Sequence, residues 1–294
     1  MQKSKAEEAL SQAEQHWTDG DMAAAREAFR RARLHFHEAG DRGGESGSLA
    51  RLGELEHRQG HMKAARELYV EARTLLTGEA DPLAQADVLI LLGELERSEN
   101  NHGAARQALE SARELYHGGG DLGGETQAWL RLGWVASSEG REDKALDAFK
   151  KAEQLARQAG DDQAGGQALM ALADIERKLN RLDLAHQAIS QALALFKSSG
   201  DVLDEAAAMA ELATLARDVG ERVQAVEGYQ KAAHLFAAAG DLKGEALVLL
   251  ALARLEYGHD SQAARKAAEH AAQLLERVGD RDHMDQAKQL LAGL

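Results

Sequence analysis

The sequence predicts an all-α solenoid of about seven helical hairpins. The main observation is a repeat of 40 residues marked by the dipeptide Gly-Asp, and a fixed period of this size is typical of a stacked array. The composition agrees, since one proline and 4% aromatic residues suit helices better than sheets. Gly-Asp occurs at Gly40-Asp41, Gly120-Asp121, Gly160-Asp161, Gly200-Asp201 and Gly240-Asp241, with Ala80-Asp81 at the missing position and Gly279-Asp280 one residue early.

Composition and charge exclude several classes of function. The chain has no cysteine, which rules out disulfides, thiolate metal sites and cysteine nucleophiles. This permits a reducing compartment, and we expect the protein to be cytoplasmic. The net charge of −14 disfavours binding to nucleic acid or to anionic lipid. No apolar run approaches the roughly 18 residues of a membrane span, so we expect no membrane insertion.

The repeat divides the chain into hairpins within one predicted domain, residues 1–294. The last segment, residues 285–294, is expected to form a helix that covers the final hairpin, because an end unit with nothing stacked on it exposes its apolar face. The expected hairpins are residues 6–45, 46–85, 86–125, 126–165, 166–205, 206–245 and 246–284.

The first helix of each hairpin has an apolar stripe with a small residue in its middle. Trp129, Leu132, Gly133 and Ala136 have the spacing that places residues on one helix face. Glycine in mid-helix costs about 0.5–1 kcal/mol relative to alanine, so we expect close approach of the second helix here. The small residues are Gly53, Gly93, Gly133, Ala173, Ala213 and Ala253.

The second helix has a large residue between two small ones, such as Phe149 between Ala145 and Ala152. This pattern favours tight helix packing. At its end, the glycine of Gly-Asp is expected to terminate the helix and the aspartate to cap the next one. The turns inside hairpins are expected at Gly20, Gly60, Gly140 and Gly220, with Asn100 and Asn180 in the same role.

These residues resemble the tetratricopeptide repeat, and the 40-residue length with its Gly-Asp ending is similar to the long variant of Pins/LGN-type adaptors, kinesin light chains and MalT-type regulators. The usual closing proline is absent, which agrees with a longer second helix. The tyrosine usual late in the first helix is replaced by Glu56, Glu96, Glu176 and Glu256. The resemblance implies a right-handed superhelix whose first helices line a concave groove that binds peptides, helices or protein surfaces.

No constellation of residues indicates catalysis. The glycine-rich run 118–124 lacks the Gly-Lys-Ser/Thr ending of a phosphate-binding loop and lies at a repeat boundary. His57 and His61 are separated by the turn at Gly60, so they do not share a helix face as zinc ligands would. We therefore predict that the protein is not an enzyme and has no cofactor or metal.

Arginine is frequent on the first-helix face that, by the resemblance, lines the groove. Two interpretations remain open. Each arginine pairs with the acidic residue one turn before it on a solvated helix, or the arginines form a ladder for an acidic segment with Trp134 as an aromatic anchor. The carboxylate clamp of chaperone-binding relatives is disfavoured, since only Arg131 fits it. The predicted partner-binding residues are Arg51, His57, Arg58, Arg97, Arg131, Trp134, Arg177, Lys178, Arg217, Arg254 and Tyr257, and Leu130 and Leu250 are placed on the same face.

We predict a monomeric, non-enzymatic scaffold or adaptor that binds a peptide or helix of a partner protein. The alternative is a sensor module whose groove binds a small peptide or metabolite and thereby controls a partner. Sensors of this type are usually fused to an effector domain, and the repeats leave no residues over for one.

Overall fold

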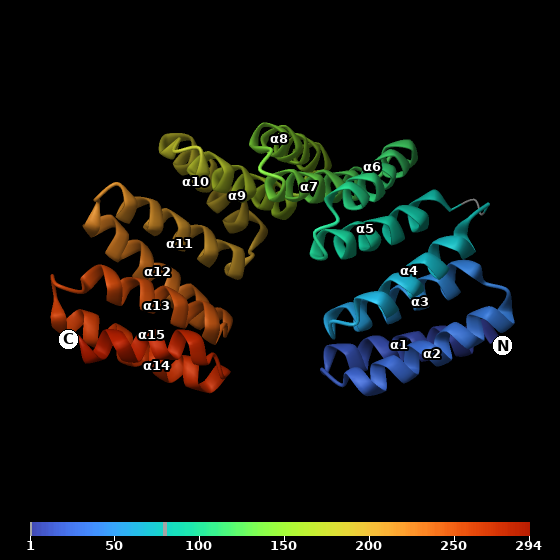
Figure 1. Ribbon diagram of the computed structural model, residues 1–294, viewed down its shortest axis with the longest axis horizontal. Helices are drawn as coiled ribbons and strands as arrows, with labels where there is room; N and C mark the ends of the chain where they lie inside the picture. The colour runs from blue at the N-terminus through green and yellow to red at the C-terminus, as the bar shows by residue number, and fades with distance from the viewer. Residues whose placement is uncertain (1, 79–80) are drawn as a thin grey trace. The chain divides into compact units, whose positions relative to one another are not determined.

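The computed structural model describes residues 2–78 and 81–294, which form helices and turns without a strand (Figure 1). The chain divides into two compact units, Met1–Ala159 and Gly160–Leu294. In each unit, consecutive antiparallel helices pack as hairpins, and each hairpin stacks on the next. The all-α solenoid architecture is therefore confirmed.

The first unit contains α1 (Gln2–Thr18), α2 (Met22–Ala39), α3 (Arg42–Arg58), α4 (Met62–Leu76), α5 (Pro82–Ser98), α6 (His102–Gly119), α7 (Leu122–Ser138) and α8 (Glu142–Ala159). The second contains α9 (Asp162–Lys178), α10 (Leu182–Ser199), α11 (Val202–Asp218), α12 (Arg222–Ala239), α13 (Leu242–Glu256), α14 (Ser261–Val278) and α15 (Arg281–Ala292).

The aspartate of each boundary caps the first helix that follows it. The Asp121 side chain accepts a hydrogen bond from the Gly124 backbone N–H, and Asp161 accepts one from Ala164, both at 2.9 Å. When aspartate is the N-cap residue, the helix begins at the residue after it. In α7 this holds although Gly123 and Gly124 lie in the first turn. The first helices therefore begin about four residues before the boundaries expected from the sequence, and the last helix is 281–292 instead of 285–294.

Left-handed residues end the helices where the sequence predicted them. Gly40 and Gly240, after second helices, have φ of 70° and 76°, and Gly60, inside a hairpin, has φ of 80°. Asn100 and Asn180 adopt the same region, with φ of 62° and 58°. Asparagine is one of the few residues other than glycine that visits this conformation routinely.

The two helices of a hairpin meet at the small residue of the first helix. A Cβ atom on Gly133 would lie 2.6 Å from Cδ1 of Phe149, and one on Gly93 would lie 2.7 Å from Cδ2 of Leu109. Both distances are far inside van der Waals contact, so these glycines leave space for the large residue of the second helix. The predicted close approach is confirmed.

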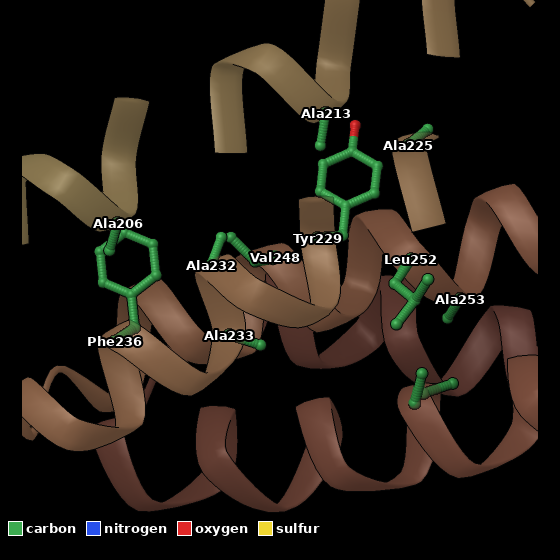
Figure 2. Packing of buried hydrophobic residues seen from close by; sticks show 12 residues of the cluster. Ala206, Ala213, Ala225, Tyr229, Ala232, Ala233, Phe236, Val248, Leu252 and Ala253 are labelled. Carbon is green, nitrogen blue, oxygen red and sulfur yellow. The ribbon is translucent and has the colours of Figure 1, made fainter. Parts of the chain in front are cut away.

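The hairpin of α11 and α12 makes the same contact in a different way. Its first helix has Ala213 where Gly133 stands in α7, and the ring of Tyr229 lies beside it (Figure 2). The missing side chain is instead at Gly228 on the second helix, where a Cβ atom would lie 2.7 Å from that of Ala213. One of the two facing positions must therefore lack a Cβ atom when the neighbouring residue is a tyrosine.

Three of the four glutamates that replace the usual tyrosine pair with arginines of the preceding second helix, whereas Glu176 pairs with Arg181 in the turn of its own hairpin. Arg26 Nε of α2 lies 3.1 Å from Glu56 of α3, and Arg66 of α4 lies 2.9 Å from Glu96 of α5. In the second unit Arg222 of α12 pairs with Glu256 of α13. The aromatic packing of the usual repeat is replaced here by ion pairs between hairpins.

The last helix, α15, packs on α13 and α14 as the sequence predicted. Ala287 is buried, and Leu290 and Leu291 are partly buried against the apolar residues of the last hairpin. The Tyr257 hydroxyl, at the end of α13, donates a hydrogen bond to the Gly293 carbonyl at 3.2 Å. None of the described helices combines the length and apolar character needed to cross a membrane.

The contact between Gly133 and Phe149 predicts a specific cost of adding one methyl group. Gly133→Ala should destabilise the protein by about 1–3 kcal/mol, because the core must shift to admit the Cβ atom. Adding Phe149→Ile, which reproduces Ala173 and Ile189 of the next hairpin, should recover part of that loss. Gly118→Ala, on α6 where nothing lies within 4 Å, should be neutral or stabilising. Thermal and urea melts would measure all three, and equal melts for Gly133→Ala and Gly118→Ala would contradict the assigned packing.

The cap at Asp161 makes an independent prediction. Asp161→Ala should cost about 1 kcal/mol, because the Ala164 N–H loses its side-chain acceptor. Asp161→Ser retains an acceptor at the cap and should cost much less. Chemical denaturation of the two variants measures the difference, and identical midpoints would show that Asp161 is only a connecting residue.

Candidate functional site

In the first unit the first helices form the more closely spaced layer. α3 contacts α5, and α5 contacts α7, in addition to the contacts of each with its own hairpin partner. Among the described residues, consecutive second helices do not pack against one another to the same extent. A surface made by one helix of each repeat therefore runs across α3, α5 and α7, and such surfaces are the usual binding faces of solenoids.

This surface is hollowed into a groove with a volume of about 520 Å³, here called the α3–α5–α7 groove. It has side chains from all three first helices, together with a tyrosine of α6 and the aspartate that caps α7. Its lining residues are Gly47, Ala50, Arg51, Glu54, Asp87, Ile90, Leu91, Tyr116, Asp121, Gly124, Gln127 and Arg131.

Arg131 is held at the α5 side of α7 by two partners. Its Nε atom lies 2.8 Å from a carboxylate oxygen of Glu94, and its NH1 atom donates to the Gln127 side chain at 2.6 Å. Only 20% of its side chain is exposed. The guanidinium group is thus fixed before a ligand arrives, which reduces the entropy lost on binding.

Arg51 occupies the α3 side of the same groove. Its NH1 atom donates to the Glu54 carboxylate at 2.9 Å, within the same helix, and half of its side chain is exposed. An ion pair this exposed contributes little to stability. Arg51 can therefore exchange its partner more readily than Arg131.

Sequence reasoning missed one polar contact in the groove. The Tyr116 hydroxyl donates to the Asp87 carboxylate at 2.6 Å, and burial together with this hydrogen bond raises the pKa of Tyr116 above its usual range. The sequence contained one indication of this contact. Position 116 is a tyrosine, whereas the equivalent positions of other repeats are Phe36, Phe196 and Phe236. A buried tyrosine generally requires a partner for its hydroxyl.

The other predicted residues of the first unit lie outside this lining. His57 contacts the Ser98 hydroxyl at 3.3 Å, and the Arg58 guanidinium stacks over the Trp17 ring at 4.6 Å. Arg97 has its Nε atom buried without a hydrogen-bond partner. Trp134 is 37% exposed and packs edge-on against Phe149, with 6.4 Å between ring centroids.

In the second unit the predicted arginines are also paired. Arg177 lies 3.4 Å from Asp174 on its own helix and 3.3 Å from Glu211 on α11, at a small cavity of about 220 Å³. Arg217 pairs with the adjacent Asp218 at 2.6 Å, and this hydrogen bond raises the pKa of the guanidinium group. Lys178 Nζ lies 2.7 Å from Asp174.

Arg254 and Tyr257 face the last helix. Arg254 donates a hydrogen bond to the side chain of Gln286 on α15, and Tyr257 donates to Gly293. Both residues therefore contribute to the packing of α15. Leu130 and Leu250 are buried at 0% and 2% exposure, so their placement on the groove face was wrong. Each faces the hydrophobic core, because the apolar surface of these first helices is wider than the four-residue stripe.

The predicted binding residues thus lie in two sets, one in each unit. In both sets, several of the basic residues form ion pairs with acidic side chains. Of the two interpretations from the sequence, pairing with an acid one turn earlier describes Arg177 and Asp174. Arg51 instead pairs with Glu54 one turn later, and Arg217 pairs with the adjacent Asp218. Arg131 instead pairs across helices with Glu94. The described residues contain no group of three or more potential metal ligands.

Comparison with known proteins gives one family match, at residues 126–158, to the tetratricopeptide repeat. A sequence comparison with curated proteins found no match. BtubC (BKLC) from P. vanneervenii is similar in structure, with a TM-score of 0.64 and 18% identity over 75% of this chain and 90% of that one. Aspartyl phosphate phosphatase F from Bacillus subtilis has a TM-score of 0.69 and 15% identity, over 97% and 70%. A Rap protein complexed with Competence and Sporulation Factor has a TM-score of 0.59 and 14% identity, over 99% and 97%.

The family match covers most of α7 and α8, the hairpin in which Gly133 contacts Phe149. Most of the other hairpins have helices of similar length, and a capping aspartate precedes the first helix at each described repeat boundary. The narrower resemblance to Pins/LGN-type adaptors, kinesin light chains and MalT-type regulators stays a prediction. Residues 126–158 therefore match the tetratricopeptide repeat, and the described residues form an all-α solenoid of helical hairpins, as the sequence indicated.

Proposed function

We propose that the protein is a non-enzymatic interaction scaffold whose α3–α5–α7 groove binds a segment of a partner protein. The observation that carries this proposal is the groove itself, where three consecutive repeats present fixed charged groups beside apolar side chains. A binding surface of this kind requires few groups with defined positions, and Arg131 is held by Glu94 and Gln127. The cysteine-free composition suits the reducing cytoplasm, where we place this function.

The charges of the groove favour a segment that bears both signs. Arg51 and Arg131 line it together with the carboxylates of Glu54, Asp87 and Asp121. An acidic ligand would have to replace the acids that already pair with the arginines, so the net gain is smaller than for a free arginine. A segment with an acidic group for Arg51 and a basic or amide group for the carboxylates uses the whole lining.

Apolar contacts provide the second part of the recognition. Ile90 and Leu91 of α5 lie between the charged groups of α3 and α7 in the lining. Trp134 lies one helical turn beyond Arg131 on α7, and its exposed part offers an aromatic surface for a ligand that continues past the groove. Exposed tryptophan and arginine are common among residues that dominate binding energy.

A second candidate is a sensor that binds a small ligand in the same groove. The groove volume, about 520 Å³, is within the range of small-molecule sites. One structural neighbour, a Rap protein, was crystallised with Competence and Sporulation Factor. In this alternative, ligand binding would change the spacing of α3, α5 and α7 and so alter a surface read by another protein.

The groove proposal predicts the effect of changing Arg131 and Trp134 together. Peptides selected from a displayed library of random sequences on the wild-type protein should bind Arg131→Glu/Trp134→Ala at least about tenfold more weakly, since a charged contact and an aromatic contact are lost. Arg157→Glu provides the control, because Arg157 lies on α8 with 73% of its side chain exposed and makes the same charge change outside the groove. Fluorescence anisotropy measures the affinities. Circular dichroism should show retained helicity with a lower melting temperature, because the double variant loses the Arg131–Glu94 and Trp134–Phe149 contacts.

Salt and ligand size distinguish the two candidates. Binding of selected peptides should weaken as salt rises, because part of the affinity is electrostatic. Equal affinity of the double variant and the wild type would contradict the α3–α5–α7 groove as the binding site. A small metabolite that raises the melting temperature of the wild type but not of the double variant, without any peptide binding, would favour the sensor.

A further inference from the structure

The second unit has a different groove, formed by α10, α11 and α12 and here called the α10–α12 groove. Its volume is about 590 Å³. Whereas three first helices form most of the α3–α5–α7 groove, this groove has one first helix, α11, between the two second helices α10 and α12. The floor is apolar and comes from α11, with Met209, Leu212, Leu215, Ala216 and Val219.

The equivalent surface of the first unit is crossed by charged side chains. Two repeats earlier, Arg106 of α6 pairs with Glu139 at the end of α7, with NH1 and Oε1 3.0 Å apart. Arg113 also lies over the Trp129 ring, 5.4 Å from its centroid. Four basic and three acidic residues line that surface.

In the α10–α12 groove these groups are replaced. His186 stands in the place of Arg106, and Val219 in the place of Glu139. Val219, at the C-terminal end of α11, is 51% exposed. The ion pair that crosses the surface in the first unit is therefore absent here, and an apolar strip remains open to solvent.

A glycine of α12 forms part of the lining of this groove. Gly228 has no side chain, which lets the backbone of α12 lie against Ala213 of α11, and both residues line the groove. The closest approach of α11 and α12 therefore lies at the groove.

The polar rim of the groove is acidic. Asp183, Glu221 and Glu227 line it together with one lysine, Lys231. Lys231 pairs with Glu227 at 3.9 Å, whereas no ion pair of Asp183 or Glu221 is found among the described residues. The whole chain has a net charge of −14, which disfavours a second copy of itself as the occupant. Charge complementarity therefore points to a basic partner.

The lining also indicates the conformation of the partner. The groove consists of helix side chains, and the helix backbones already make their own hydrogen bonds. An extended segment would lose water from its backbone groups without finding partners here, whereas a helix satisfies its own. A helix with an apolar face flanked by basic residues fits both the floor and the rim.

We propose that the α10–α12 groove is a second docking surface, which binds an amphipathic helix of a partner protein with its apolar side chains on Val219 and Met209 and its lysines or arginines at Asp183 and Glu221. This surface lies in the other unit from the α3–α5–α7 groove and does not depend on the function proposed for that groove. It would allow the scaffold to hold a second protein.

The test introduces the charged pair of the first unit at the equivalent positions of the second unit. His186→Arg/Val219→Glu places the Arg106–Glu139 pair in the α10–α12 groove, at a turn whose backbone accepts glutamate at Glu99 and Glu139. The probe is a synthetic helix-forming peptide with leucines along one face and lysines beside them. The wild-type protein, residues 1–294, should bind it, and the variant should bind at least about tenfold more weakly, because the apolar contact is lost.

Three controls separate the apolar contact from general attraction to an acidic protein. Val223→Glu adds the same charge at a site that is 68% exposed and outside the lining, so it should not weaken binding. A peptide of identical composition with its leucines spread around the helix should bind weakly. A peptide with glutamate in place of lysine should also bind weakly, and affinity for the basic peptide should fall with salt.

Several results would overturn the proposal. These are equal binding of the basic peptide to His186→Arg/Val219→Glu and to the wild type, equal binding of the acidic peptide, or no binding of the basic peptide. Sedimentation of the free protein tests the other occupant. Self-association that is abolished by Val219→Glu would show that the groove binds a second copy of the chain instead of a basic helix.

Discussion

Most repeats depend on a contact between a large side chain of the second helix and a position on the first helix that has little or no side chain. The last hairpin is the exception, with Ala268 at the place of the large residue. Gly133 and Phe149 show the contact most directly, because the ring occupies the volume that a Cβ atom would need. This contact fixes how closely the two helices approach and at which residues they cross. In the hairpin of α11 and α12 the glycine has moved to the facing helix, yet the contact persists through Ala213, Gly228 and Tyr229.

With the backbone of the repeat fixed in this way, the surfaces can vary without loss of fold. Position for position, Arg106 and Glu139 of the first unit become His186 and Val219 of the second, and the crossing ion pair gives way to an open apolar strip. Surface changes of this kind cost little stability, because exposed ion pairs contribute at most about 1 kcal/mol. A repeat protein can therefore obtain different binding surfaces from equivalent positions.

Much of this fold could be predicted from the sequence because its determinants are local. The caps at Asp121 and Asp161, the left-handed turns at Gly60 and Asn100, and the glycine at 133 each follow from residue type and spacing. The predicted repeat boundaries lie about four residues after the observed starts of the first helices, although the aspartate that caps each start was recognised in the sequence. The burial of Leu130 was also missed, because a stripe of four positions understates the width of the buried face.

By itself, the sequence determined the period, the order of the helices and the type of contact inside each hairpin, because these depend on interactions between residues close together along the chain. Only the tertiary structure decided which side chains of different repeats meet. Tyr116 reaches Asp87, Arg131 reaches Glu94 instead of an acid on its own helix, and Arg254 and Tyr257 face the last helix. Such partners are set by the stacking of neighbouring repeats, and the spacing of residues along one helix carries no information about that stacking.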